Sequence, residues 1–90
     1  MAIAIYFRLQ GMTTERYDQV IARLDAAGAS APAGRLYHAA FGEKDGLHVF
    51  DVWESQDTFD AFGATLMPIL GEFGVDPGQP MIAPVHNTMS

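Results

Sequence analysis

The chain has 90 residues, 49% of them hydrophobic, and its 11 acidic and 5 basic side chains give a formal net charge of −6. This length predicts a single domain over residues 1–90, and the few, unclustered Lys and Arg residues exclude a nucleic-acid-binding protein, which must neutralise phosphates. With no cysteine and no apolar run near the roughly 18 residues of a membrane span, we expect a cytoplasmic protein without disulfides, thiolate metal sites or a membrane partner.

The first predicted elements are a strand and a helix. Residues 2–9, AIAIYFRL, alternate in a way that predicts a strand with one apolar face. Thr13 or Thr14 can cap a following helix with its hydroxyl, and Gly28 is well placed to end that helix. The apolar stripe expected on this helix consists of Tyr17, Val20, Ile21 and Leu24.

A hairpin follows. Residues 35–42 predict a second strand and residues 47–54 a third. Between them GEKDG, residues 42–46, holds two glycines and an Asp-Gly pair, which is a strong hairpin signal. Ser55 then caps a second helix.

The second helix and the last strand carry prolines. The buried stripe of this helix runs through Phe59 and Phe62, and Pro68 predicts a kink or a break because it has no N–H to donate. Residues 81–88 predict a final strand, which we place at an edge of the sheet because it contains Pro84.

The order β-α-β-β-α-β predicts an α+β fold of the ferredoxin-like type, with a four-stranded antiparallel sheet and two helices on one face. The other face would carry apolar residues such as Ala4, Phe41 and Val85, which do not suit contact with water. We therefore expect a homodimer in which the bare sheet faces of two copies meet.

Candidate chemistry concentrates around residues 46–62. A histidine is the natural general base near neutral pH, so His48 and His38 are the candidate catalytic residues. Alternation along the strand places His48 on the opposite face from Asp51 and Trp53, whereas the cross-strand neighbour of His38 depends on a hairpin register that the sequence leaves open. No metal-binding spacing of histidines is present, so we expect no metal.

The remaining candidates would shape a pocket for a small hydrophobic or aromatic ligand. Tyr6 and Tyr37 offer phenols that can orient a carbonyl or carboxylate, and Trp53 and Phe62 offer an aromatic wall. For Trp53 the alternative is a core or dimer-interface anchor. For Arg8 we expect an ion pair with a carboxylate across the sheet, such as Asp51.

The segment Asp51-Val52-Trp53-Glu54-Ser55, followed by Asp57, Phe59 and Phe62, resembles the dimeric α/β-barrel superfamily and especially its antibiotic-biosynthesis-monooxygenase-like (ABM-like) members. The resemblance covers almost the whole chain in length and element order. It implies a ferredoxin-like homodimer with a ligand cavity between sheet and helices, in a group that includes cofactor-independent oxygenases of anthrones and quinols.

This chain departs from that group at two points. Many ABM-like members have a histidine on the second helix about where Phe62 stands here. The haem-degrading branch has an asparagine on its first strand, and IAIYFRL has none. We therefore expect no haem and no other cofactor.

The function we expect is small-ligand binding with cofactor-independent oxygenation of an aromatic, polyketide-like or quinol substrate. In that hypothesis His48 or His38 is the base, Tyr6 stabilises the developing oxyanion, and Trp53 and Phe62 hold the ring. Two alternatives stay open: a non-catalytic binding or assembly module, and an isomerase or lyase of the same superfamily.

Overall fold

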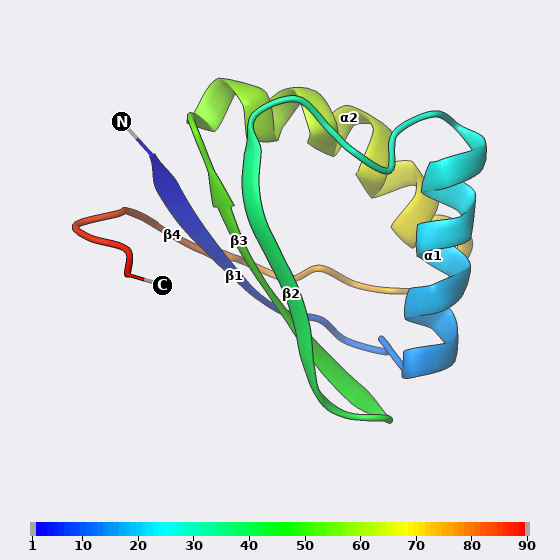
Figure 1. The fold of residues 1–90 in the computed structure, drawn as a ribbon. Coiled ribbons are helices and arrows are strands. Elements are labelled where there is room, and N and C mark those ends of the chain that lie inside the picture. The colour runs from blue at the N-terminus through cyan, green and yellow to red at the C-terminus, as the bar shows by residue number, and fades with distance from the viewer. Residues whose placement is uncertain (1, 90) are drawn as a thin grey trace.

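The protein is described by a computed structural model that covers residues 2–89. The predicted βαββαβ order is confirmed, and its elements are β1 (Ile3–Arg8), α1 (Thr14–Ala26), β2 (Arg35–Glu43), β3 (Gly46–Trp53), α2 (Gln56–Glu72) and β4 (Met81–Pro84). The strands form one antiparallel sheet in the order β2-β3-β1-β4. Both helices lie on one side of it, here called the inner face, and no helix of residues 2–89 lies on the opposite outer face (Figure 1).

The strand register decides which side chains reach the inner face. Between β1 and β3, Ile5 lies opposite Asp51 and Phe7 lies opposite Val49. Between β2 and β3, His38 lies opposite Asp51. Because side chains alternate along a strand and paired residues share a face, these residues all point toward the helices.

One irregularity interrupts the alternation at the start of β2. Arg35 lies opposite Trp53 and Tyr37 lies opposite Val52, so that Leu36 is an additional residue and the register shifts there. Such a β-bulge changes which face the residues before it occupy. As a result Arg35 and His38, which are three positions apart, both lie on the inner side of the sheet.

Local capping explains where the helices begin and end. The Thr13 hydroxyl accepts a hydrogen bond from the backbone N–H of Arg16 at 3.1 Å, and the Ser55 hydroxyl accepts one from the N–H of Thr58 at 3.2 Å. Both serve a backbone donor that the first turn leaves without a helical partner. After α1, Gly28 takes a positive φ of 73°, a conformation that glycine adopts without strain.

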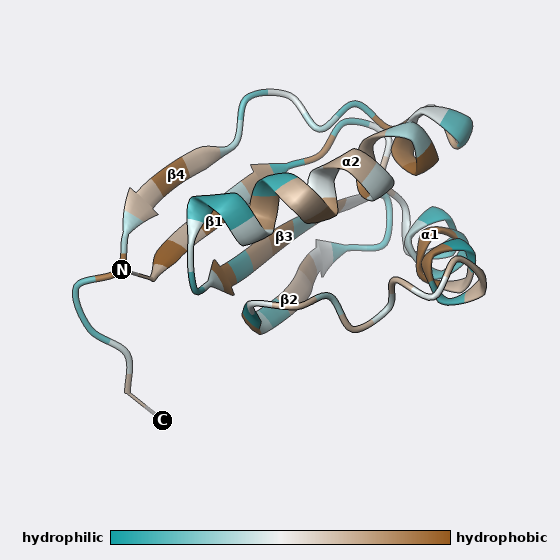
Figure 2. Cartoon of the chain, turned by 90° about the horizontal axis from the view of Figure 1, so that it is seen from above, coloured by the Kyte–Doolittle hydropathy of each residue, from teal (hydrophilic) through white to brown (hydrophobic). Residues whose placement is uncertain are grey.

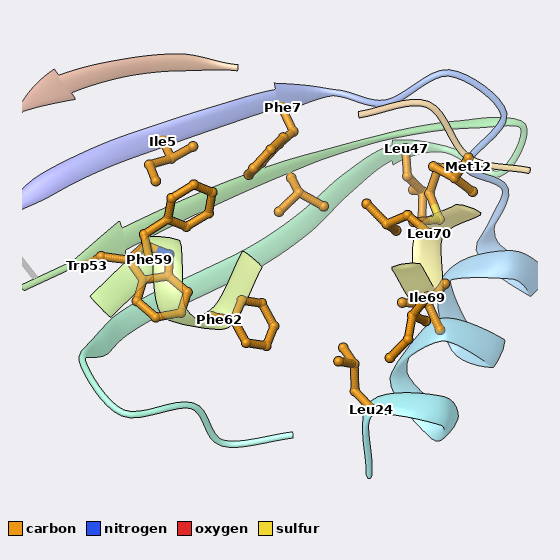
Figure 3. Close-up of a cluster of buried hydrophobic side chains, with 13 residues drawn as sticks. Ile5, Phe7, Met12, Leu24, Leu47, Trp53, Phe59, Phe62, Ile69 and Leu70 are labelled. Atoms are coloured by element: carbon orange, nitrogen blue, oxygen red, sulfur yellow. The ribbon is translucent and has the colours of Figure 1, made fainter. Parts of the chain in front are cut away.

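The core lies between the inner face and the helices. Trp53 and Ile5 are completely buried, and Trp53 contacts Phe59 and Phe62 with ring centroids 5.6 and 5.4 Å apart. Figure 3 shows these three aromatic side chains grouped beside the first turns of α2. Figure 2 shows hydrophobic segments of β1 and β3 beneath that helix.

The two proline expectations meet different outcomes. α2 continues from Gln56 to Glu72 with Pro68 inside it, so the helix is not broken. The last strand is at the sheet edge, as expected, but it ends at Pro84 and not at residue 88. A proline cannot donate a ladder hydrogen bond, which suits the end of an edge strand.

Candidate functional site

A chain of hydrogen-bonded polar side chains lies at the inner face, between β2, β3 and α1. His38 is at its centre. Its Nδ1 lies 2.5 Å from Oδ1 of Asp51, and its Nε2 lies 2.7 Å from the hydroxyl of Tyr17. The other carboxylate oxygen of Asp51 accepts a hydrogen bond from the indole Nε1–H of Trp53 at 3.2 Å. Four side chains from three elements are thereby linked in a row.

Asp51 is the most buried ionisable group of this row, with 4% of its surface exposed. A buried carboxylate is costly unless its oxygens are hydrogen-bonded, and here both oxygens have a donor. The Trp53 indole is therefore more than core packing, because it holds one of these oxygens in place. Trp53 is itself completely buried and is not among the residues that line the inner cavity, so its place as a wall of the ligand pocket stays a prediction.

The network also assigns the proton positions on His38. A carboxylate accepts hydrogen bonds, so Nδ1 carries a proton and donates it to Asp51. In the neutral imidazole Nε2 is then the acceptor, and the Tyr17 hydroxyl donates to it. A carboxylate on Nδ1 is the arrangement that orients a histidine as a base and stabilises its protonated form.

Tyr17 extends from α1 toward His38. Its ring is stacked on the imidazole, with centroids 6.0 Å apart and planes 8° from parallel. Burial raises the pKa of the Tyr17 phenol above its ordinary value of 10.0; the charge of Arg35 lowers this pKa, and the charges of Asp51 and Asp18 raise it. The net shift is upward, so the hydroxyl keeps its proton at neutral pH and can donate it to His38.

A small cavity of about 50 Å³ opens beside this row. Its lining is largely apolar and includes Phe62, Leu66 and Leu70 from α2. The polar groups that reach it are Tyr17, Arg35, His38 and Asp51. An apolar cavity with a few convergent polar groups is the usual form of a ligand site. A cavity of this volume has room for a few water molecules.

A second set of aromatic and histidine side chains lies on the outer face. The Tyr6 hydroxyl is 2.6 Å from Nδ1 of His48, and the rings of Tyr6 and Phe41 both stack on that imidazole. Tyr37, 54% exposed, meets Phe50 edge to face. A hollow of about 940 Å³ lies between this face and the segment after β4.

The six residues predicted from sequence therefore do not form one site. His38, Trp53 and Phe62 lie on the inner side, and the other three, Tyr6, Tyr37 and His48, lie on the outer face. The physical reason is the two-residue period of the strands, which separates His48 from Trp53. The expected ion pair between Arg8 and Asp51 is also wrong, because Arg8 lies opposite His48 in the register and therefore on the outer face, whereas Asp51 binds His38.

Sequence reasoning missed three members of the inner site. Tyr17 was expected in the apolar stripe of its helix and Asp51 as the partner of Arg8. No role was expected for Arg35. The register could have revealed Asp51: a two-residue turn at Lys44 and Asp45 pairs Glu43 with Gly46, and counting back pairs His38 with Asp51. No sequence signal we know would have placed Arg35, because the bulge at Leu36 is not encoded in the apolar pattern.

Within residues 2–89 no group of three or more His, Asp or Glu side chains is arranged to hold a metal ion. No helix in the same range is both long and apolar enough to cross a membrane.

Comparison with known proteins finds the same fold. No family model and no curated protein matches the chain. Among solved structures, SnoaB, a cofactor-independent oxygenase from Streptomyces nogalater, is 18% identical with a TM-score of 0.64, and the match covers 98% of this chain and 94% of SnoaB. A proposed antibiotic biosynthesis monooxygenase from Chloroflexus aurantiacus J-10-fl is 15% identical with a TM-score of 0.60, covering 99% of this chain and 95% of that one.

A third solved structure, the protein YJCS, is 9% identical with a TM-score of 0.67, covering 96% of this chain and all of that chain. The matches thus extend over the full length of the domain. They confirm the predicted resemblance to ABM-like proteins at the level of the fold. At such low sequence identities a structural likeness does not extend to activity.

Proposed function

We propose that this protein binds a small aromatic molecule with an acidic O–H between its sheet and helices, and that it oxygenates this molecule without a cofactor. The observation that carries the proposal is the hydrogen-bonded row Tyr17–His38–Asp51 at the wall of an apolar cavity. The fold it shares with SnoaB, a cofactor-independent oxygenase, adds support. A one-ring quinol fits this proposal best, because the cavity is small, about 50 Å³, and larger ring systems would need more space.

His38 is the base in this proposal. A substrate hydroxyl would replace the Tyr17 hydroxyl at Nε2 and transfer its proton there, while Asp51 stabilises the imidazolium that results. The apolar lining keeps water away from the phenolate, which makes it a better electron donor. His48 has no part in this step, since it lies on the outer face.

The oxygen chemistry then belongs to the substrate. The phenolate gives one electron to dioxygen, and the resulting radical and superoxide join to form a carbon–oxygen bond. Loss of the ring hydrogen and cleavage of the O–O bond release water and leave a hydroxyquinone. One oxygen atom enters the ring and the other leaves as water, so that no external reductant is needed.

An oxygen electrode with hydroquinone as substrate tests the proposal, with a chelator present and the uncatalysed rate subtracted. We expect His38→Ala to lower kcat by at least about 100-fold, the usual effect of removing a general base. The matched variant His48→Ala removes the same side chain from the other face and should keep most of the activity. Equal activity of the two variants, or full activity in His38→Ala, would contradict the assignment of His38.

The same base could serve an isomerase, because the His38–Asp51 pair itself needs no oxygen. Turnover of an enolisable ketone under nitrogen, dependent on His38, would favour that alternative over oxygenation. Saturable binding without turnover, unchanged in His38→Ala, would favour a binding module.

We further propose that two copies associate through the outer face. Large apolar side chains are exposed there, among them Leu36, Tyr37 and Phe41, at 60%, 54% and 48%. Exposed apolar patches of this kind commonly mark interfaces, and a self-complementary sheet face suits a two-fold dimer.

A further inference from the structure

Arg35 is the one cationic side chain among the residues that line the inner cavity. It stands at the start of β2, opposite Trp53, on the same side of the sheet as His38. The register shift at Leu36 is what makes this possible, since two residues three positions apart on a regular strand would face opposite ways. The bulge thus brings a positive charge to the same wall as the proposed base.

The guanidinium of Arg35 has hydrogen-bonding capacity to spare. It donates one hydrogen bond, from Nη2 to the carbonyl of Ser30 at 3.1 Å, out of the five N–H groups that an arginine carries. Within residues 2–89 no carboxylate lies within 4.0 Å of it. The nearby acid of the site is already engaged, because both oxygens of Asp51 accept hydrogen bonds from His38 and Trp53.

The charge of Arg35 acts on the site itself. It lowers the pKa of the Tyr17 phenol, against the larger effect of burial, which raises that pKa. Its field therefore reaches the hydroxyl that a substrate would replace. The chain as a whole repels anions, since its net charge is −6. An anionic ligand would depend on this local cation.

We propose that the substrate is a phenolic acid: Arg35 binds its carboxylate while His38 faces its phenol. Planar, two-pronged binding of a carboxylate is what a guanidinium does best. This inference rests on the proposed function, whose base and cavity it shares, and it adds the charge class of the substrate. The competing explanation is structural: Arg35 would only fasten the loop before β2 through Ser30.

A matched pair of ligands tests the inference directly. The compounds 2,5-dihydroxybenzoate and 2,5-dihydroxybenzamide have nearly the same shape and differ in charge. We would measure both dissociation constants by calorimetry, without oxygen, at an ionic strength of about 0.15 M. We expect the wild type to bind the carboxylate at least about tenfold more tightly than the amide, as hydrogen bonds to charged groups allow.

Arg35→Met should abolish this preference and leave the amide affinity nearly unchanged. Arg8→Met is the matched control, because it removes the same charge from the outer face of the same sheet and should keep the preference. Arg35→Lys should restore part of it, which guards against a folding defect in the methionine variant. Circular dichroism would confirm that each variant is folded.

Three outcomes would overturn the inference: equal affinity of the wild type for the two compounds, a preference that persists in Arg35→Met, or no binding of either compound. The result is separable from the proposed oxygenation. His38-dependent turnover of hydroquinone without any preference for the carboxylate would contradict Arg35 alone. A preference that depends on Arg35 in a protein that consumes no oxygen would contradict the oxygenase alone.

Discussion

Tyr17 couples the stability of the protein to pH in a direction that its surroundings determine. Burial raises the pKa of this phenol in the folded state above 10.0, the ordinary value that it recovers on unfolding. The unfolded chain therefore loses the phenolic proton first as pH rises. The stability that the protonated phenol contributes is complete below pH 10 and is lost as the pH rises through the folded-state pKa.

Tyr17→Phe tests this directly. The free energy of unfolding of the wild type should exceed that of the variant at pH 8, because the phenol donates to His38. This advantage should shrink between about pH 10 and pH 11, since only the wild type loses the buried phenol's contribution there. Urea unfolding of both proteins at several pH values measures the difference. An advantage that stays constant up to pH 11 would contradict the raised pKa.

At this same residue scale, the sequence predicts some site residues better than others. His38 was a candidate because histidine is the residue type suited to the chemistry, and it lies at the cavity. The partner of His38 depended on which two residues of GEKDG form the turn. A turn at Asp45-Gly46 would have paired His38 with Trp53; the turn at Lys44-Asp45 pairs it with Asp51.

At the scale of elements, Gly34 joins the loop before β2 to the beginning of α2. Its φ is +86°, and a Cβ added there would lie 2.6 Å from the Cβ of Thr58. Its carbonyl also accepts a hydrogen bond from the N–H of Glu54 at 2.8 Å. Gly28 has a similar φ of +73° but no atom within 4 Å of such a Cβ. The two positions therefore share a backbone conformation and differ in their surroundings.

We predict that Gly34→Ala destabilises the protein more than Gly28→Ala does. Both changes incur the strain of a left-handed backbone, about 1–2 kcal/mol, and only the first adds steric overlap, which costs about 1–3 kcal/mol more. Urea unfolding of the two variants beside the wild type gives both losses. If the two losses are equal, the contact of Gly34 with Thr58 does not constrain the fold.

The elements themselves were largely predictable, because alternation and helical spacing are strong signals in this chain. The helix cap at Ser55 and the hairpin were predicted correctly, and of the two caps considered for the first helix, Thr13 and Thr14, the structure has Thr13. The end of β4 was predicted incorrectly, at residue 88 instead of Pro84. The sequence shows where proline is tolerated but does not show how far β1, its neighbour, extends to pair with it.

At the scale of the whole molecule, the proposed dimer makes the outer face sensitive to charge. Ala39 lies on that face, half-buried and opposite Phe50. We predict that Ala39→Glu turns dimers into monomers, because a two-fold interface would bury one new carboxylate from each copy, two in all, without a partner. Ala61→Glu is the matched control, since it places the same charge on the exposed side of α2.

Native mass spectrometry over a dilution series would follow both variants and the wild type. The wild type and Ala61→Glu should be dimers at concentrations where Ala39→Glu is a monomer. A wild type that is monomeric at every concentration, or an Ala39→Glu protein that stays dimeric, would contradict an interface on this face. This measurement decides whether the outer face is a dimer interface. Exposed apolar residues on a strand indicate that the surface is covered, but they do not identify the molecule that covers it.

The extra residue at Leu36 has a consequence for how this protein would diverge. Loss of that single codon would straighten β2 and place Arg35 directly before Tyr37, so that Arg35 would still lie opposite Trp53 on the inner face and His38 opposite Asp51. Under our proposal, such a deletion would remove the irregularity of the strand and keep both the binding of acidic substrates and the base. When relatives of this chain are aligned, a gap at this position should therefore not be interpreted as a difference in substrate charge.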